Sequence, residues 1–133
     1  MIAHPSVVVH GLAQARAALR PGFPVVLLSA PAAAGYAGCL WWRELVAAAR
    51  SSYPATPALD ILDCGEAPGH AMAALRAGQR LLLLDPACPA FARVADAAAT
   101  FGAHVLSRRP PALDLAPRGA ERRLTAWLAA SPA

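Results

Sequence analysis

The stretch "ILDCGEAPGHAMAAL" (residues 61–75) holds the densest group of chemically reactive side chains in the sequence. It places Asp63, Cys64, Glu66 and His70 between an apolar run and an alanine-rich pattern. A cysteine thiolate is a nucleophile, and a histidine nearby could serve as its base. The same residues also suit an ordinary strand-to-helix turn, because aspartate caps turns and free cysteine packs as a small apolar side chain. Both interpretations stay open.

A second segment, "LDPACPAF", repeats an aspartate followed by a cysteine, here Asp85 and Cys88. If the two preceding strands are neighbours, Asp63 and Asp85 lie close together and could share acid–base work or a cation. Capping a turn is the commoner role of such an aspartate. Cys64, Cys88 and the nearby histidine lack the paired spacing of a zinc site. We therefore expect no metal and no cofactor.

The elements that must position these residues are indicated by short apolar runs bounded by turn residues. Continuous apolar runs are typical of strands buried on both faces of a parallel sheet. Alanine-rich helical patterns separate the runs, so the order predicts right-handed β-α-β units. The predicted strands are 6–10, 24–29, 58–63, 80–85 and 103–107, and the predicted helices between them are 11–20, 30–50, 68–78 and 88–102.

This pattern predicts an α/β fold: a three-layer α/β/α sandwich with a mainly parallel, five-stranded sheet, Rossmann-like or flavodoxin-like. The alternative is a partial (β/α) barrel, since five strands are too few to close an eightfold one. Prolines in "RRPPALDLAP" predict an irregular connection, followed by a helix at about 119–130. We expect residues 1–133 to form one domain, with 110–133 as the proline-rich connection and C-terminal helix.

Open parallel sheets bind ligands beyond the carboxyl ends of their strands. That rule makes Ser29, Asp63, Gly65, Asp85 and Arg108 the candidate ligand-binding residues. The expected ligand is a small polar or anionic molecule, because helix N-termini and an arginine favour anions. No nucleotide-binding glycine motif is present. A weaker alternative is a small hydrolase or transferase that uses Asp63 or Cys64, so the sequence leaves open whether the protein is an enzyme.

Tryptophans suggest a different kind of function. Trp41 and Trp42 flank the apolar face of the predicted helix at 30–50, and Trp127 lies on the apolar face of the last helix. Tryptophan is common in cores and is enriched at interaction hot spots. The alternative function is therefore a non-catalytic module that forms a homo-oligomer or docks on a partner through these helices.

The amino-acid composition limits which classes of partner and which locations in the cell we expect. Hydrophobic residues make up 57% of the chain, which supports a packed core, and the net charge is +4 with every basic residue an arginine. The late arginines are not interleaved with aromatic side chains, so we expect no nucleic-acid partner. Prolines and glycines interrupt the uncharged stretch between Arg20 and Arg43, so we expect no membrane span. Three cysteines and no recognisable signal peptide favour the cytoplasm.

Overall fold

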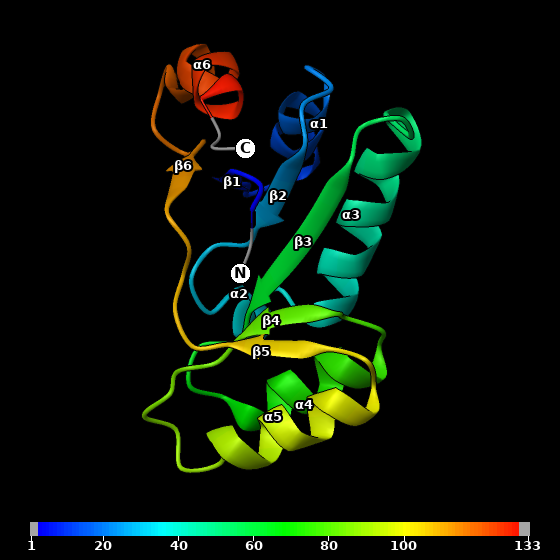
Figure 1. The fold of residues 1–133 in the computed structure, drawn as a ribbon, viewed down its shortest axis with the longest axis vertical. Coiled ribbons are helices and arrows are strands. Elements are labelled where there is room, and N and C mark those ends of the chain that lie inside the picture. The colour runs from blue at the N-terminus through cyan, green and yellow to red at the C-terminus, as the bar shows by residue number, and fades with distance from the viewer. Residues whose placement is uncertain (1–2, 131–133) are drawn as a thin grey trace. The chain divides into compact units, whose positions relative to one another are not determined.

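A computed structural model describes residues 3–130 and shows an α/β protein with one all-parallel, six-stranded sheet flanked by helices (Figure 1). The strand order is β5-β4-β3-β2-β1-β6. The strands are β1 (Ser6–Val8), β2 (Val25–Leu28), β3 (Ala58–Asp63), β4 (Leu81–Leu83), β5 (His104–Leu106) and β6 (Ala112–Asp114). The helices are α1 (Leu12–Leu19), α2 (Ala33–Tyr36), α3 (Cys39–Ser52), α4 (Pro68–Arg76), α5 (Phe91–Thr100), the 3-10 helix η1 (Ala120–Arg123) and α6 (Leu124–Ala129).

The α/β class and the parallel sheet are confirmed, but the sheet has six strands where five were predicted. The prediction of irregular structure after β5 is wrong at β6, which pairs in parallel with β1. β6 begins directly after Pro110 and Pro111, so neither proline has to donate a hydrogen bond within the strand. β5 and β6 stand at the two ends of the strand order, so the sheet is open and does not close into a barrel.

The helix predicted at 30–50 is divided into α2 and α3. Gly38 separates them with a φ of +91°, a conformation that a continuous right-handed helix does not allow. The backbone turns here and α3 begins afresh at Cys39. The last predicted helix also has two parts, because its first turn is the 3-10 helix η1.

The chain forms two compact units, and the first takes its residues from 1–28, 45–60 and 110–133. Its core is built on β1 and β2, whose seven residues are all buried. α1 covers them with small side chains such as Ala15 and Ala18. α6 adds Leu124 and Leu128, both at most 5% exposed. The predicted apolar face of the last helix is therefore its packing face.

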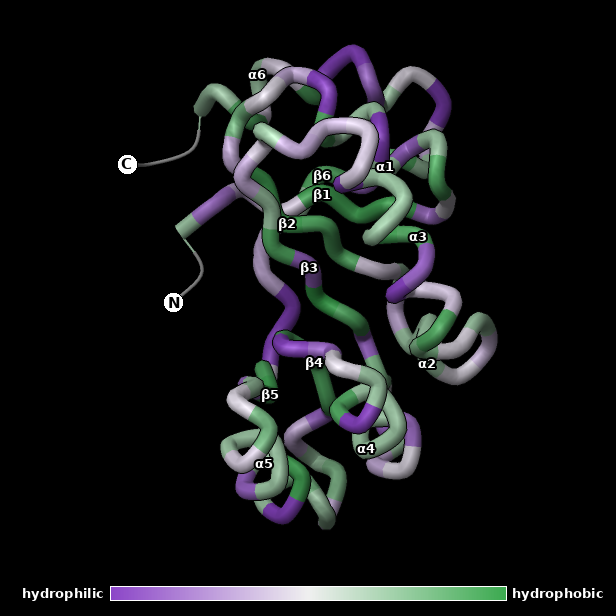
Figure 2. Tube along the Cα trace, turned by 90° about the vertical axis from the view of Figure 1, so that its right-hand side faces the viewer, coloured by the Kyte–Doolittle hydropathy of each residue, from purple (hydrophilic) through white to green (hydrophobic). Residues whose placement is uncertain are grey.

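The second unit consists of Ser29–Glu44 and Ile61–Arg109. α4 and α5 lie side by side along β4 and β5 in both views (Figures 1 and 2). The strands supply leucines to the core, and Ala71, Ala74 and Ala98 on the helices are fully buried. Alanines at these positions let the helices approach the sheet closely. Figure 2 shows the apolar strands as green segments between more polar turns.

No helix within residues 3–130 is both long enough and apolar enough to cross a membrane.

Candidate functional site

The carboxyl ends of β3, β4 and β5 meet at one edge of the second unit. Asp63 pairs with Leu83, and Leu83 pairs with Leu106, so the three strands end in register. The ladder continues past the strands, since the Leu84 amide donates to the Leu106 carbonyl at 3.1 Å. The residues that follow each strand are thereby held at the same edge.

A pocket of about 360 Å³ opens at this edge. Volumes of this size are within the range of small-molecule sites in proteins. Every lining residue belongs to the second unit. The lining consists of Pro31, Ala32, Asp63, Gly65, Glu66, Leu83, Leu84, Asp85, Pro86, Ser107 and Arg109.

Asp63 is the most firmly held side chain of the pocket. Its Oδ2 accepts a hydrogen bond from Arg109 Nη1 at 2.7 Å, which forms an ion pair. Its Oδ1 accepts the Gly65 amide at 2.8 Å, which closes a tight turn after β3. The carboxylate is only 10% exposed, so its bonds to the protein leave little of it for a ligand. Asp63 therefore fixes the geometry of the pocket and the position of Arg109.

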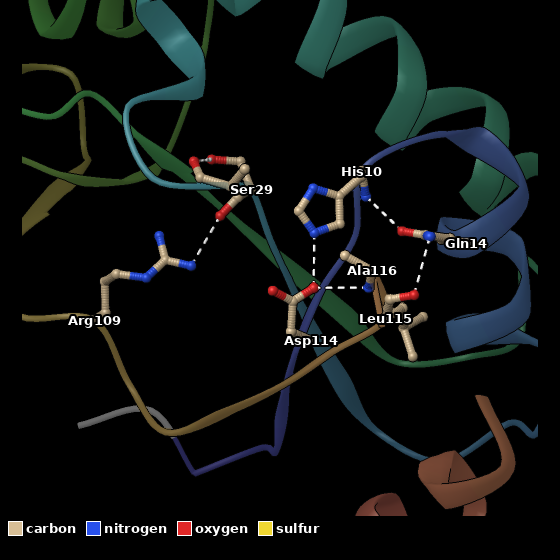
Figure 3. A network of polar contacts seen from close by, with 8 residues as sticks. His10, Gln14, Ser29, Arg109, Asp114, Leu115 and Ala116 are labelled. Carbon is tan, nitrogen blue, oxygen red and sulfur yellow. Dashed lines mark hydrogen bonds and ion pairs between the residues drawn. The ribbon is translucent and has the colours of Figure 1, made fainter. Parts of the chain in front are cut away.

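Ser29 supports the same arrangement through its hydrogen bonds. Its hydroxyl is fully buried, accepts the Asp63 amide at 2.9 Å and donates to the Ala30 carbonyl at 3.1 Å. Its own carbonyl accepts Arg109 Nη2 at 3.1 Å (Figure 3). Ser29 does not line the pocket, so the structure places this predicted ligand residue among the groups that orient Arg109.

Arg109 lines the pocket, whereas the sequence reasoning chose Arg108. Arg108 is exposed and is not among the lining residues. The two arginines are adjacent, and the chain bends at Ser107 and Arg108 after β5. The sequence contains no signal that tells which of the two side chains such a bend brings to the strand ends.

Asp85 and Glu66 are the carboxylates of the pocket without a cationic partner among the described residues. Asp85 Oδ1 accepts the Ala87 amide at 2.9 Å, which leaves its second oxygen open to the pocket. The Asp85 amide donates to the Gly65 carbonyl at 2.8 Å, which links the turns after β3 and β4. Glu66 is exposed at the pocket wall. These two groups give the pocket a negative charge.

Gly65 is required by the backbone at this site. Its φ is +59°, and a Cβ on it would lie 3.0 Å from the Cβ of Ala32. Both a strained conformation and a close contact would therefore follow any substitution. The predicted ligand residue Gly65 lines the pocket, where its amide and carbonyl already bind Asp63 and the Asp85 amide.

Cys64 is not positioned for nucleophilic chemistry. The residue is 2% exposed and does not line the pocket. Burial, together with the charges of Asp63 and Cys39, raises the pKa of the Cys64 thiol to about 12. At neutral pH the sulfur is therefore a protonated thiol, and the nucleophile hypothesis for Cys64 gains no support.

The other two reactive residues of the sequence hypothesis lie outside the pocket lining. His70 is exposed on α4, with its ring close to Gly35 of α2. Cys88 lies in the turn after β4, and its amide donates to the Asp85 carbonyl at 3.0 Å. α5 begins three residues later at Phe91, whereas the sequence predicted a helix from residue 88, so Cys88 lies ahead of the helix. Across residues 3–130, no group of three histidine, cysteine, aspartate or glutamate side chains is placed to hold a metal ion.

A separate polar cluster joins the ends of β1 and β6 in the first unit (Figure 3). His10 Nε2 lies 2.7 Å from Asp114 Oδ1, which also accepts the Ala116 amide at 2.8 Å. Gln14 accepts the His10 amide through Oε1 at 2.8 Å and donates from Nε2 to the Leu115 carbonyl at 3.2 Å. The cluster ties the first turn of α1 to both strands, which gives each of its members a structural role.

The three tryptophans differ in their surroundings. Trp42 is fully buried, so it belongs to the core and is closed to a docking partner. Trp41 is partly exposed beside it, with ring centroids 5.9 Å apart, and Leu40 is 69% exposed. Trp127 on α6 is partly exposed, and its indole Nε1 donates to the Ser6 carbonyl at 2.9 Å.

No protein-family model matches the chain, and no curated protein matches it significantly. The geometry and charge of the pocket are therefore the features from which a function can be inferred.

Proposed function

We propose that the protein binds a small polar molecule carrying a cationic group in the pocket at the carboxyl ends of β3 and β4. The observation that carries this proposal is the charge of the pocket lining: the Arg109 guanidinium is paired with Asp63, whereas Asp85 and Glu66 face the pocket without a cation. A ligand with an ammonium or guanidinium group supplies that missing partner. Carboxylates in a recessed site hold such groups through charge-assisted hydrogen bonds.

The charge balance changes the ligand expected from sequence. An anion was one expectation, because an arginine and a helix N-terminus were predicted at this edge. The arginine is committed to Asp63 and the Ser29 carbonyl, and three carboxylates line the pocket against this single guanidinium. An anionic ligand would meet net repulsion. A zwitterion remains compatible, because Arg109 is 31% exposed and can donate further hydrogen bonds.

Binding is better supported than catalysis. The pocket holds no histidine, cysteine or lysine among its lining residues, so its chemistry is limited to carboxylates, one hydroxyl and one guanidinium. The Ser107 hydroxyl lines the pocket, but no hydrogen bond to a base is seen for it among the described residues. We therefore propose a ligand-binding domain and not a hydrolase or transferase that uses Cys64.

The test is a thermal-shift screen with small amines, zwitterionic amino acids, polyols and carboxylates of similar size. A ligand at one hundred times its dissociation constant adds about 2.7 kcal/mol to the stability of the folded state. That raises the melting temperature of a domain of this size by several degrees. We expect shifts from amines or zwitterions and none from carboxylates.

The matched variants are Asp85→Asn/Glu66→Gln and Asp96→Asn/Glu44→Gln. Each removes two negative charges from the second unit, and Asp96 and Glu44 are exposed outside the pocket. Asparagine at position 85 retains Oδ1, so the bond from the Ala87 amide can persist. We expect only the first pair to abolish the shift. Equal loss in both pairs, or shifts from carboxylates alone, would contradict the proposal.

A further inference from the structure

A second cavity lies in the first unit and shares no lining residue with the proposed ligand pocket. Its volume is about 430 Å³. One wall is Leu113 of β6, an edge strand of the sheet, and the rest comes from η1 and α6. We call this cavity the α6 groove, and its lining is Leu113, Arg122, Arg123, Ala126, Trp127 and Ala130.

The floor of the α6 groove is apolar and firmly positioned. Ala126 and Ala130 are one helical turn apart, and their short side chains leave room along α6. Trp127 stands beside them, and its indole N–H is already bound to the Ser6 carbonyl at 2.9 Å. The indole therefore offers a ligand only its apolar ring surface. Leu113 is 6% exposed and continues this surface onto β6.

The rim of the α6 groove is positively charged. This rim consists of Arg122 and Arg123, which are exposed and line the groove, and no hydrogen bond or ion pair to either guanidinium is seen among the described residues. The neighbouring acidic residues do not line the groove: Asp114 is bound to His10, and Glu121 acts on Arg20, whose pKa it helps to raise after the larger effect of Tyr53. Two guanidinium groups beside an apolar floor complement a ligand with the opposite arrangement.

We propose that the α6 groove binds a small amphipathic anion, a carboxylate or sulfonate attached to an aromatic or aliphatic body. Guanidinium groups bind carboxylates through paired, charge-assisted hydrogen bonds, which are stronger than those to a neutral acceptor and which a cationic head group cannot form. The apolar body lies against Trp127 and the two alanines, where it removes apolar surface from water. This site differs from the proposed ligand pocket in unit, in lining and in the sign of its charge.

Decanoate is the test ligand. Decyltrimethylammonium keeps its apolar body with the charge reversed, and acetate keeps its negative charge without the apolar body. The readout is the indole N–H signal of Trp127 in ¹H–¹⁵N NMR spectra, assigned with Trp127→Phe. We expect decanoate to move this signal in a saturable way and the two controls to leave it nearly unchanged. A response to decyltrimethylammonium equal to that of decanoate would mean that apolar surface alone drives binding, which would overturn the proposal.

Two double variants separate the groove from general electrostatics. Arg122→Gln/Arg123→Gln removes the rim charges, and Arg50→Gln/Arg118→Gln removes two exposed charges of the same unit outside the groove. We expect at least a tenfold loss of decanoate affinity in the first pair and less than a twofold change in the second. Equal losses would overturn the proposal, as would binding to anionic phospholipid vesicles or to RNA with no saturable response to decanoate.

Discussion

The residue that organises the ligand pocket is Arg109, because it joins two strand ends that are far apart in sequence. Its guanidinium bonds the Asp63 carboxylate and the Ser29 carbonyl. The Asp63 side chain is only 10% exposed, so the Arg109 guanidinium is needed to stabilise its negative charge. Removing Arg109 would destabilise the folded protein, because the cost of desolvating the Asp63 carboxylate would no longer be offset by an ion pair.

Replacing Arg109 by methionine should lower the free energy of unfolding by about 1–3 kcal/mol, the cost of leaving a charged, poorly exposed group without its hydrogen bonds. Urea denaturation measures this change. Arg109→Lys is the control: it keeps the charge but not the two-pronged geometry, so its loss should be smaller. If both variants are as stable as the wild type, Arg109 does not organise the site.

Cys64 predicts a specific dependence of stability on pH. Its folded pKa is raised to about 12, so above the unfolded thiol pKa of about 8.5 the unfolded chain releases a proton that the folded chain keeps. Between those values the unfolded state binds fewer protons, so the free energy of unfolding falls by roughly 1 kcal/mol per pH unit. Cys64→Ala should remove that slope relative to wild type in urea denaturation between pH 8 and 10. An unchanged slope would show that the thiol titrates normally in the folded protein.

At the scale of the element, α3 is anchored by one of its two adjacent tryptophans. Trp42 is fully buried and Trp41 is not. Trp42→Ala should cost about 3–5 kcal/mol, as large-to-small substitutions in cores do. Trp41→Ala should cost distinctly less, which chemical denaturation of the two variants compares directly. Equal costs would mean that the exposed indole is as important to the packing of α3 as the buried one.

A second prediction at this scale concerns β1, where Ser6 is 1% exposed. Its hydroxyl oxygen has no hydrogen-bond partner within residues 3–130. A buried hydroxyl without a partner loses its hydration and gains nothing in return. Ser6→Ala should therefore raise the free energy of unfolding by about 1 kcal/mol, and Ser51→Ala, an exposed serine of α3, should leave it nearly unchanged. A destabilised Ser6→Ala variant would indicate that the hydroxyl is bonded in solution.

The elements that could be predicted from sequence are those with a strong periodic signal. β3 was predicted at its observed limits, 58–63, because the mainly apolar run "ALDILD" ends in an aspartate that closes a turn. β6 was missed because three residues after two prolines give almost no pattern. The break at Gly38 was missed because glycines at positions 35 and 38 are tolerated within an otherwise helical pattern. The short strand β6 and the break at Gly38 depend more on tertiary packing than on the local sequence.

The sequence predicted the location of the candidate site better than the set of residues that line it. Asp63, Gly65 and Asp85 were named because they follow strands, and all three line the pocket. From the sequence, Glu66 was named only as one of the reactive side chains of residues 61–75, and Arg108 was chosen where Arg109 lines the pocket. Their roles depend on which side of the backbone each side chain takes, and that is decided by tertiary contacts. The negative charge of the pocket therefore became visible only in three dimensions.

At the scale of the whole molecule, net charge is a poor guide to what the protein binds. The chain carries +4, yet the pocket of the second unit is lined by three carboxylates and one arginine. Most of the arginines that give the chain its positive charge lie outside this pocket, and two of them, Arg122 and Arg123, line the α6 groove. The two proposed sites therefore call for ligands of opposite sign, which a single average charge would conceal.

The most direct test of the proposed ligand pocket is an NMR titration with the amine or zwitterion that gives the largest thermal shift. The amides of Gly65 and Ala87 donate to the carboxylates of Asp63 and Asp85, so their signals report on the pocket itself. We predict that these two signals, with that of Glu66, move most and saturate together in the wild type, and that the Gly65 and Ala87 signals stay fixed in Asp85→Asn/Glu66→Gln. Shifts concentrated on other residues, or unchanged affinity in that variant, would contradict the account.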